Sequence, residues 1–409
     1  MSEQPTALPQ PILDALACSR FLRRQLDSRS WLAPRLAASI GAPLDATAMR
    51  DFLRDEKVDD NTLKPVLRRL RAWVICHVMV RDLARLADLA EVTETMTVLA
   101  DIAVETAHDI VRAGLVARHG MPLSTDGREQ EFIIIGMGKL GGRELNVSSD
   151  IDLIYVYPED GSTAGPKIID NFEFFTKLGR GIIQALNDLT GDGQVFRVDM
   201  RLRPNGDSGP LVASFDMLEN YFITQGREWE RYAWIKARVM TGIRSAELAD
   251  IARPFIFRKY LDFGAINAMR DLHAQIRREV ARKDMAHNVK LGPGGIREIE
   301  FLAQVFQLIR GGRDTSLQIK PTLKVLDRLA ERGIITREAE QQLAAAYDFL
   351  RRVEHRLQYL DDAQTHNLPA GPDDQALVAR AMGFAGYDAL LAELDRHREA
   401  VGRHFNGVF

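Results

Sequence analysis

The sequence predicts an α+β fold that is mostly helical, with one small sheet flanked by N-terminal helices and a C-terminal helical bundle. Apolar residues recur at the helical period from about residue 10 to 120, three short strand-like segments follow, and helical periodicity returns near residue 215. We therefore expect an N-terminal helical region at 1–120, an α/β core at 121–245 and a C-terminal helical domain at 246–409.

The composition is that of a globular protein without nucleic-acid or membrane partners. Its 54 Lys and Arg residues nearly balance its 57 Asp and Glu residues, so no basic excess is present to follow a phosphate backbone or anionic lipid. The longest apolar stretch, 72–80, is far shorter than the ~20 residues that cross a bilayer, and the first residues lack a signal-peptide pattern. Cys18 and Cys76 have neither disulfide nor zinc-site spacing. We expect a cytoplasmic protein that is not exported.

The N-terminal region is expected to form packed amphipathic helices. Leu67, Leu70, Val74 and Val78 recur at the 3.6-residue period, and Gly120 is expected to end the last of these helices. No polar cluster in this region has the spacing of a catalytic site, so a packing or docking role is expected.

Three segments of the core are predicted to be strands. Residues 131–135 and 151–157 are apolar and β-branched runs, stopped by a glycine and a proline respectively. Residues 195–203 alternate strictly, with their apolar side chains on the core face. The opposite face of this third strand carries Arg197, Asp199, Arg201 and Arg203.

A helix is predicted between the second and third strands. Pro166 is expected to open it and Gly191 to close it, because the intervening apolar residues fall on one helical stripe. Beyond residue 215 only helices are expected, with glycine-rich breaks at 292–295 and 311–312.

The strongest chemical feature lies where the second strand begins. Asp150 and Asp152 are two residues apart, so both carboxylates point to one face of a strand. Adjacent carboxylates repel each other unless a cation lies between them, and Mg²⁺ prefers such oxygen ligands. Asp199 is expected to be the third ligand if the two strands are neighbours. We therefore expect Asp150, Asp152 and Asp199 to be the metal ligands and the catalytic residues.

A glycine-rich turn precedes these aspartates and is expected to bind phosphate. Residues 136–142 read Gly-Met-Gly-Lys-Leu-Gly-Gly, and such a turn lets backbone N–H groups approach phosphate oxygens. Lys139 adds a positive charge. Arg201 and Arg203 share a strand face with Asp199, where they are expected to hold a second anion.

Other interpretations of this segment were weighed against the metal site. The glycines match GxGxxG, but only twelve residues, 138–149, separate them from the next strand, too few for the crossover helix of a dinucleotide fold. A Walker A loop requires Ser or Thr after its lysine, whereas Leu140 follows Lys139. A glycine turn with a purely structural role remains as an alternative. For Asp199, Arg201 and Arg203 the structural alternative is that they are ordinary charged residues on the solvent-facing side of a strand.

Together these residues resemble the polymerase-β-type nucleotidyltransferase superfamily. Its pattern is an apolar residue, a glycine and a glycine or serine, about a dozen further residues, and then Asp-x-Asp within a strand. Residues 135–137 and 150–153 occupy those places, with Met137 where the family usually has glycine or serine. The resemblance implies a polymerase-β-like nucleotidyltransferase sheet.

Four longer segments are similar to the family of bifunctional glutamine synthetase adenylyltransferase/adenylyl-removing enzymes. They are residues 136–154, 196–204, 226–233 and 290–301. The similarity covers essentially the whole chain but only the N-terminal half of the family's proteins, which contain two nucleotidyltransferase units, so we expect a piece of a longer protein. Segment 146–152 is most similar to the adenylyl-removing copy.

The resemblance implies a reaction, a cofactor and partners. Inorganic phosphate attacks the adenylyl-tyrosine of adenylylated glutamine synthetase and releases ADP and unmodified tyrosine, in the control of nitrogen assimilation. The implied cofactor is Mg²⁺, and the implied partners are an adenine nucleotide, inorganic phosphate and a PII-type nitrogen signal protein. The residues expected to contact nucleotide or phosphate are Gly136, Gly138, Lys139, Ser149, Arg201 and Arg203.

Two other functions compete with this one. The same fold could run forward and transfer AMP from ATP to a protein tyrosine. Alternatively, the chain could be a catalytically inactive regulatory docking module, although intact aspartates argue against that.

Two further motifs are expected to be structural. The loop Gly292–Gly295 opens a predicted helix with carboxylates in its first turn, which is the usual complement to a helix dipole. Phosphate binding at this helix N-terminus is the alternative interpretation. The polar residues of segment 227–236 are expected to form an ordinary polar helix face.

Overall fold

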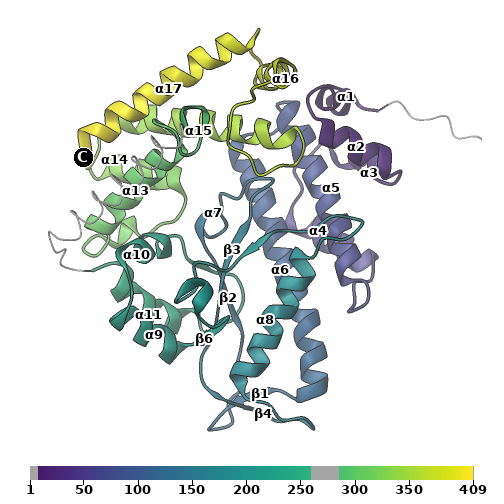
Figure 1. Cartoon of the computed structure of the whole chain (residues 1–409), viewed down its shortest axis with the longest axis vertical. Coiled ribbons are helices and arrows are strands. Elements are labelled where there is room, and N and C mark those ends of the chain that lie inside the picture. Colours follow the sequence, from purple (N-terminus) through teal and green to yellow (C-terminus); the bar gives the residue numbers. More distant parts are fainter. Residues whose placement is uncertain (1–7, 259–284, 409) are drawn as a thin grey trace, which may run out of the picture.

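The computed structural model describes residues 8–258 and 285–408, and all statements about the structure concern these residues. The chain is mostly helical and surrounds one small mixed sheet (Figure 1). This arrangement confirms the predicted mostly helical α+β class.

Six helices precede the sheet. Gly120, with a φ of +82°, caps the last of them, as predicted. The predicted apolar stripe lies on the fifth helix, where Leu67, Leu70, Val74 and Val78 are all buried. The bounds are α1 (Gln10–Leu16), α2 (Arg20–Ser28), α3 (Leu32–Ser39), α4 (Ala46–Asp55), α5 (Leu63–Leu83) and α6 (Leu89–His119).

The central sheet has the order β5-β3-β2-β7, with β6 beside β5 on the same edge of β3. The pairs β2–β3 and β2–β7 are antiparallel, whereas β3 pairs in parallel with β5 and β6. A separate antiparallel pair joins β1 to β4. The bounds are β1 (Pro122–Ser124), β2 (Ile133–Gly136), β3 (Ile151–Tyr157), β4 (Gly161–Thr163), β5 (Val198–Asp199), β6 (Val212–Ser214) and β7 (Arg238–Val239).

The sheet is covered on both faces. Ile134, Leu153 and Tyr155 belong to the hydrophobic core formed with α5, α6 and the helix α8 (Asn171–Asn187). Ile135 and Ile154 face a second core, which is shared with the C-terminal helices. Strand alternation puts Asp152 on the face of Ile154, toward those helices. Both cores include the sheet, and the domain limits at 120/121 and 245/246 stay predictions.

The remaining helices follow the sheet or connect its strands. Figure 1 shows α9 to α11 beside the sheet, opposite α8, with α13 to α17 above them. The bounds are α7 (Gly138–Gly141), η1 (Gly206–Ser208), α9 (Phe215–Thr224), α10 (Glu228–Trp234), α11 (Ser245–Ile256), η2 (Met285–His287), α13 (Ile296–Arg310), η3 (Thr315–Leu317), α14 (Thr322–Glu331), α15 (Arg337–Tyr359), α16 (Pro372–Met382) and α17 (Tyr387–Val408). No helix within the described ranges is long and apolar enough to span a membrane.

The predicted third strand, 195–203, was too long, because only Val198 and Asp199 pair with β3. The chain turns immediately afterwards, since the backbone N–H of Arg201 donates to Asp199 Oδ1 at 2.8 Å. The arginines at 201 and 203 therefore lie in a turn, and the shared strand face predicted for them is wrong.

The predicted helix 166–191 was also too long. Asp170 caps α8, accepting a hydrogen bond from the backbone N–H of Glu173 at 2.6 Å, so the helix begins at Asn171 and not at Pro166. Ile168 and Leu189, expected on its apolar stripe, lie outside the helix and are exposed. The expectation of helices alone beyond residue 215 missed β7, whose two residues are too few to show a period.

Candidate active site

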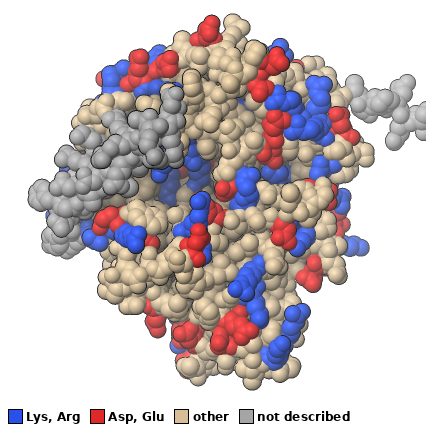
Figure 2. Space-filling view, viewed as in Figure 1, with Lys and Arg blue, Asp and Glu red and all other residues tan. Residues whose placement is uncertain are grey.

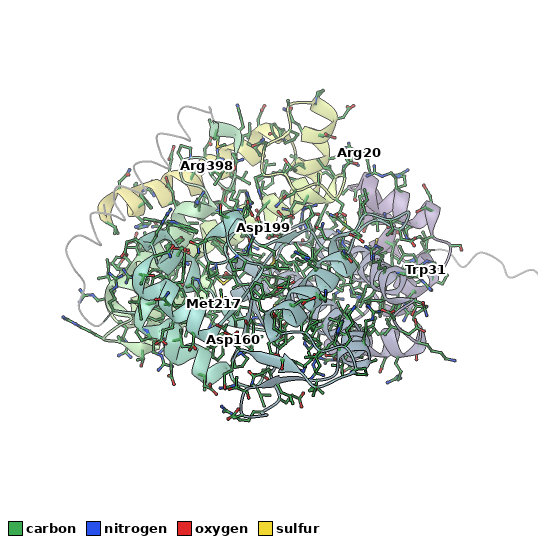
Figure 3. All side chains as sticks on the ribbon, turned by 60° about the horizontal axis from the view of Figure 1, so that its bottom comes forward. Arg20, Trp31, Asp160, Asp199, Met217 and Arg398 are labelled. Atoms are coloured by element: carbon green, nitrogen blue, oxygen red, sulfur yellow. The ribbon has the colours of Figure 1, made fainter. Side chains whose placement is uncertain are left out.

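The predicted strand neighbours bring two aspartates together. Asp152 and Asp199 are register partners in the parallel strands β3 and β5, so their side chains leave the sheet on the same face. Asp150 lies two residues before Asp152. Figure 3 shows Asp199 near the centre of the molecule, where the N-terminal helices meet the rest of the chain.

The three carboxylates act on one another. Burial, together with the negative charges of Asp199 and Asp150, raises the pKa of Asp152 to about 6. The positive charge of Lys290 opposes this shift. Asp152 therefore holds a negative charge that its surroundings stabilise poorly.

Asp150 and Asp199 are each held by an arginine. Arg197 donates through Nε to Asp150 Oδ1, and Gln364 Nε2 donates to Asp150 Oδ2 at 2.9 Å. Arg201 Nε lies 2.9 Å from Asp199 Oδ2, and these hydrogen bonds lower the pKa of Asp199. The positive charges of both arginines would oppose a cation that binds these carboxylates.

The donor chemistry suits a hard divalent cation. In the part of the chain that the structure describes, no group of three or more His, Cys, Asp or Glu side chains is placed to hold a metal ion. However, carboxylate oxygens are the ligands that such ions prefer, and the poorly stabilised charge of Asp152 is one that a cation would neutralise. The ligand types of Asp150, Asp152 and Asp199 therefore suit such a cation, although the three carboxylates are not gathered to hold one in this structure.

The glycine turn lies directly beside Asp152. Gly136 ends β2 inside the sheet, in register with Leu153, while Gly138 has a φ of +53°. A Cβ on Gly138 would lie 3.2 Å from Asp152 Oδ2, so a side chain there would crowd the carboxylate. Ser149 is partly buried, immediately before Asp150.

Lys139 has an ion-pair partner that the sequence did not suggest. Its Nζ lies 2.9 Å from Oε1 of Glu354, which is fully buried in α15. His366 Nδ1 lies 2.8 Å from the same carboxylate oxygen. Burial lowers the pKa of Lys139 to about 8, against the opposing charge of Glu354. Lys139 thus links the glycine turn to the C-terminal helices.

The two arginines of the turn after β5 differ in availability. The side chain of Arg201 is 72% exposed and borders a cavity of about 550 Å³, which Arg227 and Trp229 also line. The side chain of Arg203 is mostly buried, and its Nη1 donates to the carbonyl of Met200 at 2.8 Å. Figure 2 shows Lys and Arg side chains around a hollow near the middle of the molecule's face.

The second glycine loop caps a helix, as expected. Gly295 precedes α13, and the backbone N–H of Gly294 donates to Glu298 Oε2 at 3.1 Å. The loop also brings Lys290 close enough to act on the charge of Asp152.

The residues of segment 227–236 are largely structural. Arg231 is fully buried and donates through Nε to the carbonyl of Phe255 at 2.9 Å. Glu230 is buried and accepts a hydrogen bond from the Tyr221 hydroxyl at 2.6 Å.

Sequence reasoning missed three residues of the site. Gln364 comes from the connection between α15 and α16, in which residues 361–367 are polar except for Ala363, and no motif marks it. Glu354 lies on a helix rich in charged residues. Arg197 was predicted to lie on the third strand and was given no role, whereas it lies immediately before β5.

A small mixed sheet that carries these aspartates beside a glycine turn is the arrangement expected of the nucleotidyltransferase class. The family model described as glutamate-ammonia ligase adenylyltransferase matches residues 10–251, which is more than half of the chain. The chain therefore belongs to the glutamate-ammonia ligase adenylyltransferase family. Residues 270–409 match a second family model, described as GlnD PII-uridylyltransferase.

Several curated relatives have the same name, bifunctional glutamine synthetase adenylyltransferase/adenylyl-removing enzyme. The one from Aromatoleum aromaticum is 67% identical over 100% of this chain and 44% of its own length. Those from Nitrosomonas eutropha and Chromobacterium violaceum are each 54% identical over 96% of the chain, covering 43% and 44% of their lengths. The chain thus spans less than half the length of these relatives.

Proposed function

We propose that this chain removes the adenylyl group from glutamine synthetase by phosphorolysis. An oxygen of inorganic phosphate attacks the α-phosphorus of adenylyl-tyrosine, and the bond between that phosphorus and the tyrosine oxygen breaks. ADP forms, and the tyrosine oxygen takes up a proton. The relatives' printed name includes both an adenylylating and an adenylyl-removing activity, and the similarity of segment 146–152 to the removing copy favours this direction.

The register of Asp152 with Asp199 is the observation that carries the proposal. It brings carboxylates from two strands together beside a turn whose Gly138 leaves space at Asp152. We propose Mg²⁺ as the cation and Asp150, Asp152 and Asp199 as its ligands. When bound, the cation would neutralise negative charge as inorganic phosphate approaches the adenylyl phosphate.

The remaining residues of the site would bind and orient the substrates. The exposed Arg201, beside a cavity large enough for a phosphate group, is the proposed contact for the attacking phosphate. The backbone at Gly136 and Gly138 and the hydroxyl of Ser149 are the proposed contacts for the nucleotide. Lys139 would stabilise this turn through Glu354 and add its charge at close range.

The proposed partners are supported by the comparisons, and the proposed location by the state of the cysteines. Adenylylated glutamine synthetase is the proposed substrate, and the match of residues 270–409 to a PII-uridylyltransferase model supports a PII-type signal protein as a regulator. Cys18 and Cys76 are both free, as is usual in the reducing cytoplasm, where we propose that the protein acts.

Two assays test the direction of the reaction. Phosphate and adenylylated glutamine synthetase should yield ADP with a divalent cation present, and Asp152→Asn and Asp199→Asn should each lower the rate at least about 100-fold. Asp250→Asn, at an exposed residue of α11, is the matched control. AMP incorporation from ATP into unmodified glutamine synthetase without phosphate-dependent release would favour the forward reaction. If neither ADP release nor AMP incorporation is detected, the regulatory docking module is the function that remains.

A further inference from the structure

We infer that residues 361–367, which connect α15 to α16 and are here called the 361–367 loop, position the aspartate site through Gln364. The inference rests on the proposed function, because it concerns the orientation of Asp150. Gln364 does not contact substrate in this scheme and is a positioning residue.

Gln364 completes the set of donors that fix Asp150. Arg197 donates to Oδ1 of the carboxylate, and Gln364 Nε2 donates to Oδ2 at 2.9 Å. The first donor comes from the segment entering β5 and the second from the C-terminal helical region. Each carboxylate oxygen has two lone pairs, so an oxygen held in this way can still bind a cation.

One side of the loop is fixed to the N-terminal helices and to the start of β3. Asp362 accepts from Arg71 Nη2 of α5 at 2.9 Å, and both side chains are only 15% exposed. The hydroxyl of Ser148 donates to the other oxygen of Asp362. Asp362 has a φ of +54°, a conformation that Asp and Asn tolerate better than most residues.

The other side of the loop is fixed to the second glycine loop and to the glycine turn. The backbone N–H of Val289 donates to the carbonyl of His366 at 2.8 Å, and Asn288 Nδ2 donates to Asn367 Oδ1 at 2.7 Å. The His366 side chain contacts Glu354, which holds Lys139. Asn288 and Val289, which precede the second glycine loop, therefore support the loop that presents Gln364.

The anchors at Asp362 and His366 explain how the exposed Gln364 can orient Asp150. A free glutamine would lose side-chain entropy on making one exposed hydrogen bond, so its contact would stabilise Asp150 little. Here, anchors at Asp362 and His366 hold the backbone on either side of Gln364. Donors that orient a metal-binding side chain typically change metal affinity or activity about 10–100-fold when they are removed.

Gln364→Ala in the full 409-residue chain tests the inference. The control is Gln375→Ala, because Gln375 Nε2 donates to the carbonyl of Pro369 at 3.0 Å beyond the loop and away from the aspartates. Binding of Mn²⁺ alone is measured by calorimetry, and thermal unfolding is followed in parallel. We expect Gln364→Ala to weaken Mn²⁺ binding at least about 10-fold with an unchanged melting temperature, while Gln375→Ala binds as the wild type does.

Kinetics provide a second readout that a merely structural role would not change. In the phosphorolysis assay, Gln364→Ala should require a correspondingly higher Mg²⁺ concentration for half-maximal rate, with the KM for adenylylated glutamine synthetase unchanged. Equal Mn²⁺ affinity of Gln364→Ala and wild type would overturn the inference and leave the proposed function intact. A wild-type chain that binds no Mn²⁺ would instead overturn the metal site, and the inference with it.

A double-mutant cycle tests the loop as a unit. Asp362→Asn removes the charged anchor to Arg71, and asparagine still tolerates the positive φ. If Asp362 acts through Gln364, the double variant should bind Mn²⁺ no more weakly than the weaker single variant. Additive losses would show two independent effects and would overturn the role of the anchor.

Discussion

Asp152 and Asp199 are register partners in adjacent parallel strands, and the negative charge of Asp199 contributes to a pKa of about 6 for Asp152. The unfolded chain would have a pKa of about 3.9 for this carboxyl group. Folding therefore works against the ionised form of Asp152, as is expected of a site that awaits a cation.

Asp152→Asn is expected to stabilise the cation-free protein. Because the folded-state pKa is raised, stability that is present below pH ~4 is lost as the pH rises to about 6. The free energy of unfolding of the variant should therefore exceed that of the wild type by about 3 kcal/mol near neutral pH. The gain should disappear as the pH falls from 6 toward 4. Urea unfolding across this range measures it, with exposed Asp250→Asn as control. A neutral-pH stability below that of wild type would contradict the electrostatic argument.

Lys139→Met is expected to destabilise the protein. It leaves the carboxylate of Glu354, which is fully buried, without its closest cation, and losing one partner of such a pair typically costs about 3–5 kcal/mol. Exposed Lys177→Met, which breaks only an i,i+4 pair with Glu173, should change the free energy of unfolding by less than about 0.5 kcal/mol.

A second change separates the two roles of Lys139. Adding Glu354→Gln to Lys139→Met should recover part of the lost free energy of unfolding, because the buried carboxylate is then replaced by a neutral amide. The recovery should be incomplete, because buried Arg351 loses its ion pair with Glu354 at 3.2 Å. Phosphorolysis should stay impaired in the stabilised double variant if the lysine charge also acts on phosphate. Full activity in that variant would limit Lys139 to a structural role.

Substitution of Arg201 is expected to affect phosphate binding, whereas substitution of Arg203 is expected to affect stability. Arg201→Gln should raise the KM for inorganic phosphate. It should change the free energy of unfolding by less than about 0.5 kcal/mol, because the side chain is 72% exposed. Arg203→Gln should instead cost about 1–2 kcal/mol, because it removes a hydrogen bond to the Met200 carbonyl. Phosphate saturation curves and urea unfolding of both variants measure the contrast. The opposite pattern would assign the phosphate contact to Arg203.

Gly141→Ala is expected to disrupt the glycine turn. A Cβ at this position would lie 1.8 Å from the carbonyl oxygen of Lys236, so the backbone must shift, at a cost of at least about 2 kcal/mol. Gly114→Ala lies in α6 with open space around it and should stabilise the protein by about 1 kcal/mol. The melting temperature should therefore fall in Gly141→Ala and rise in Gly114→Ala, relative to the wild type.

Local patterns predicted much of this protein. The second strand was predicted at 151–157 and is observed there, and the end of the N-terminal helices at Gly120 was correct. The Asp150–Asp152 spacing and the glycine turn led to the family that the comparisons confirm. These features depend on neighbours along the chain, where strand alternation, helical period and turn chemistry act directly.

The amino-acid sequence by itself therefore determined the helical regions, the pair of aspartates and the class of protein. Only the tertiary structure decided that Asp199 stands beside Asp152, that Glu354 holds Lys139 and that Gln364 reaches Asp150. Each of these contacts joins elements distant in sequence, so it depends on strand order and helix packing, which no local period encodes. The turn that ends β5 early is, by contrast, local, because it depends on a contact between the Asp199 side chain and the backbone N–H of Arg201 two residues later.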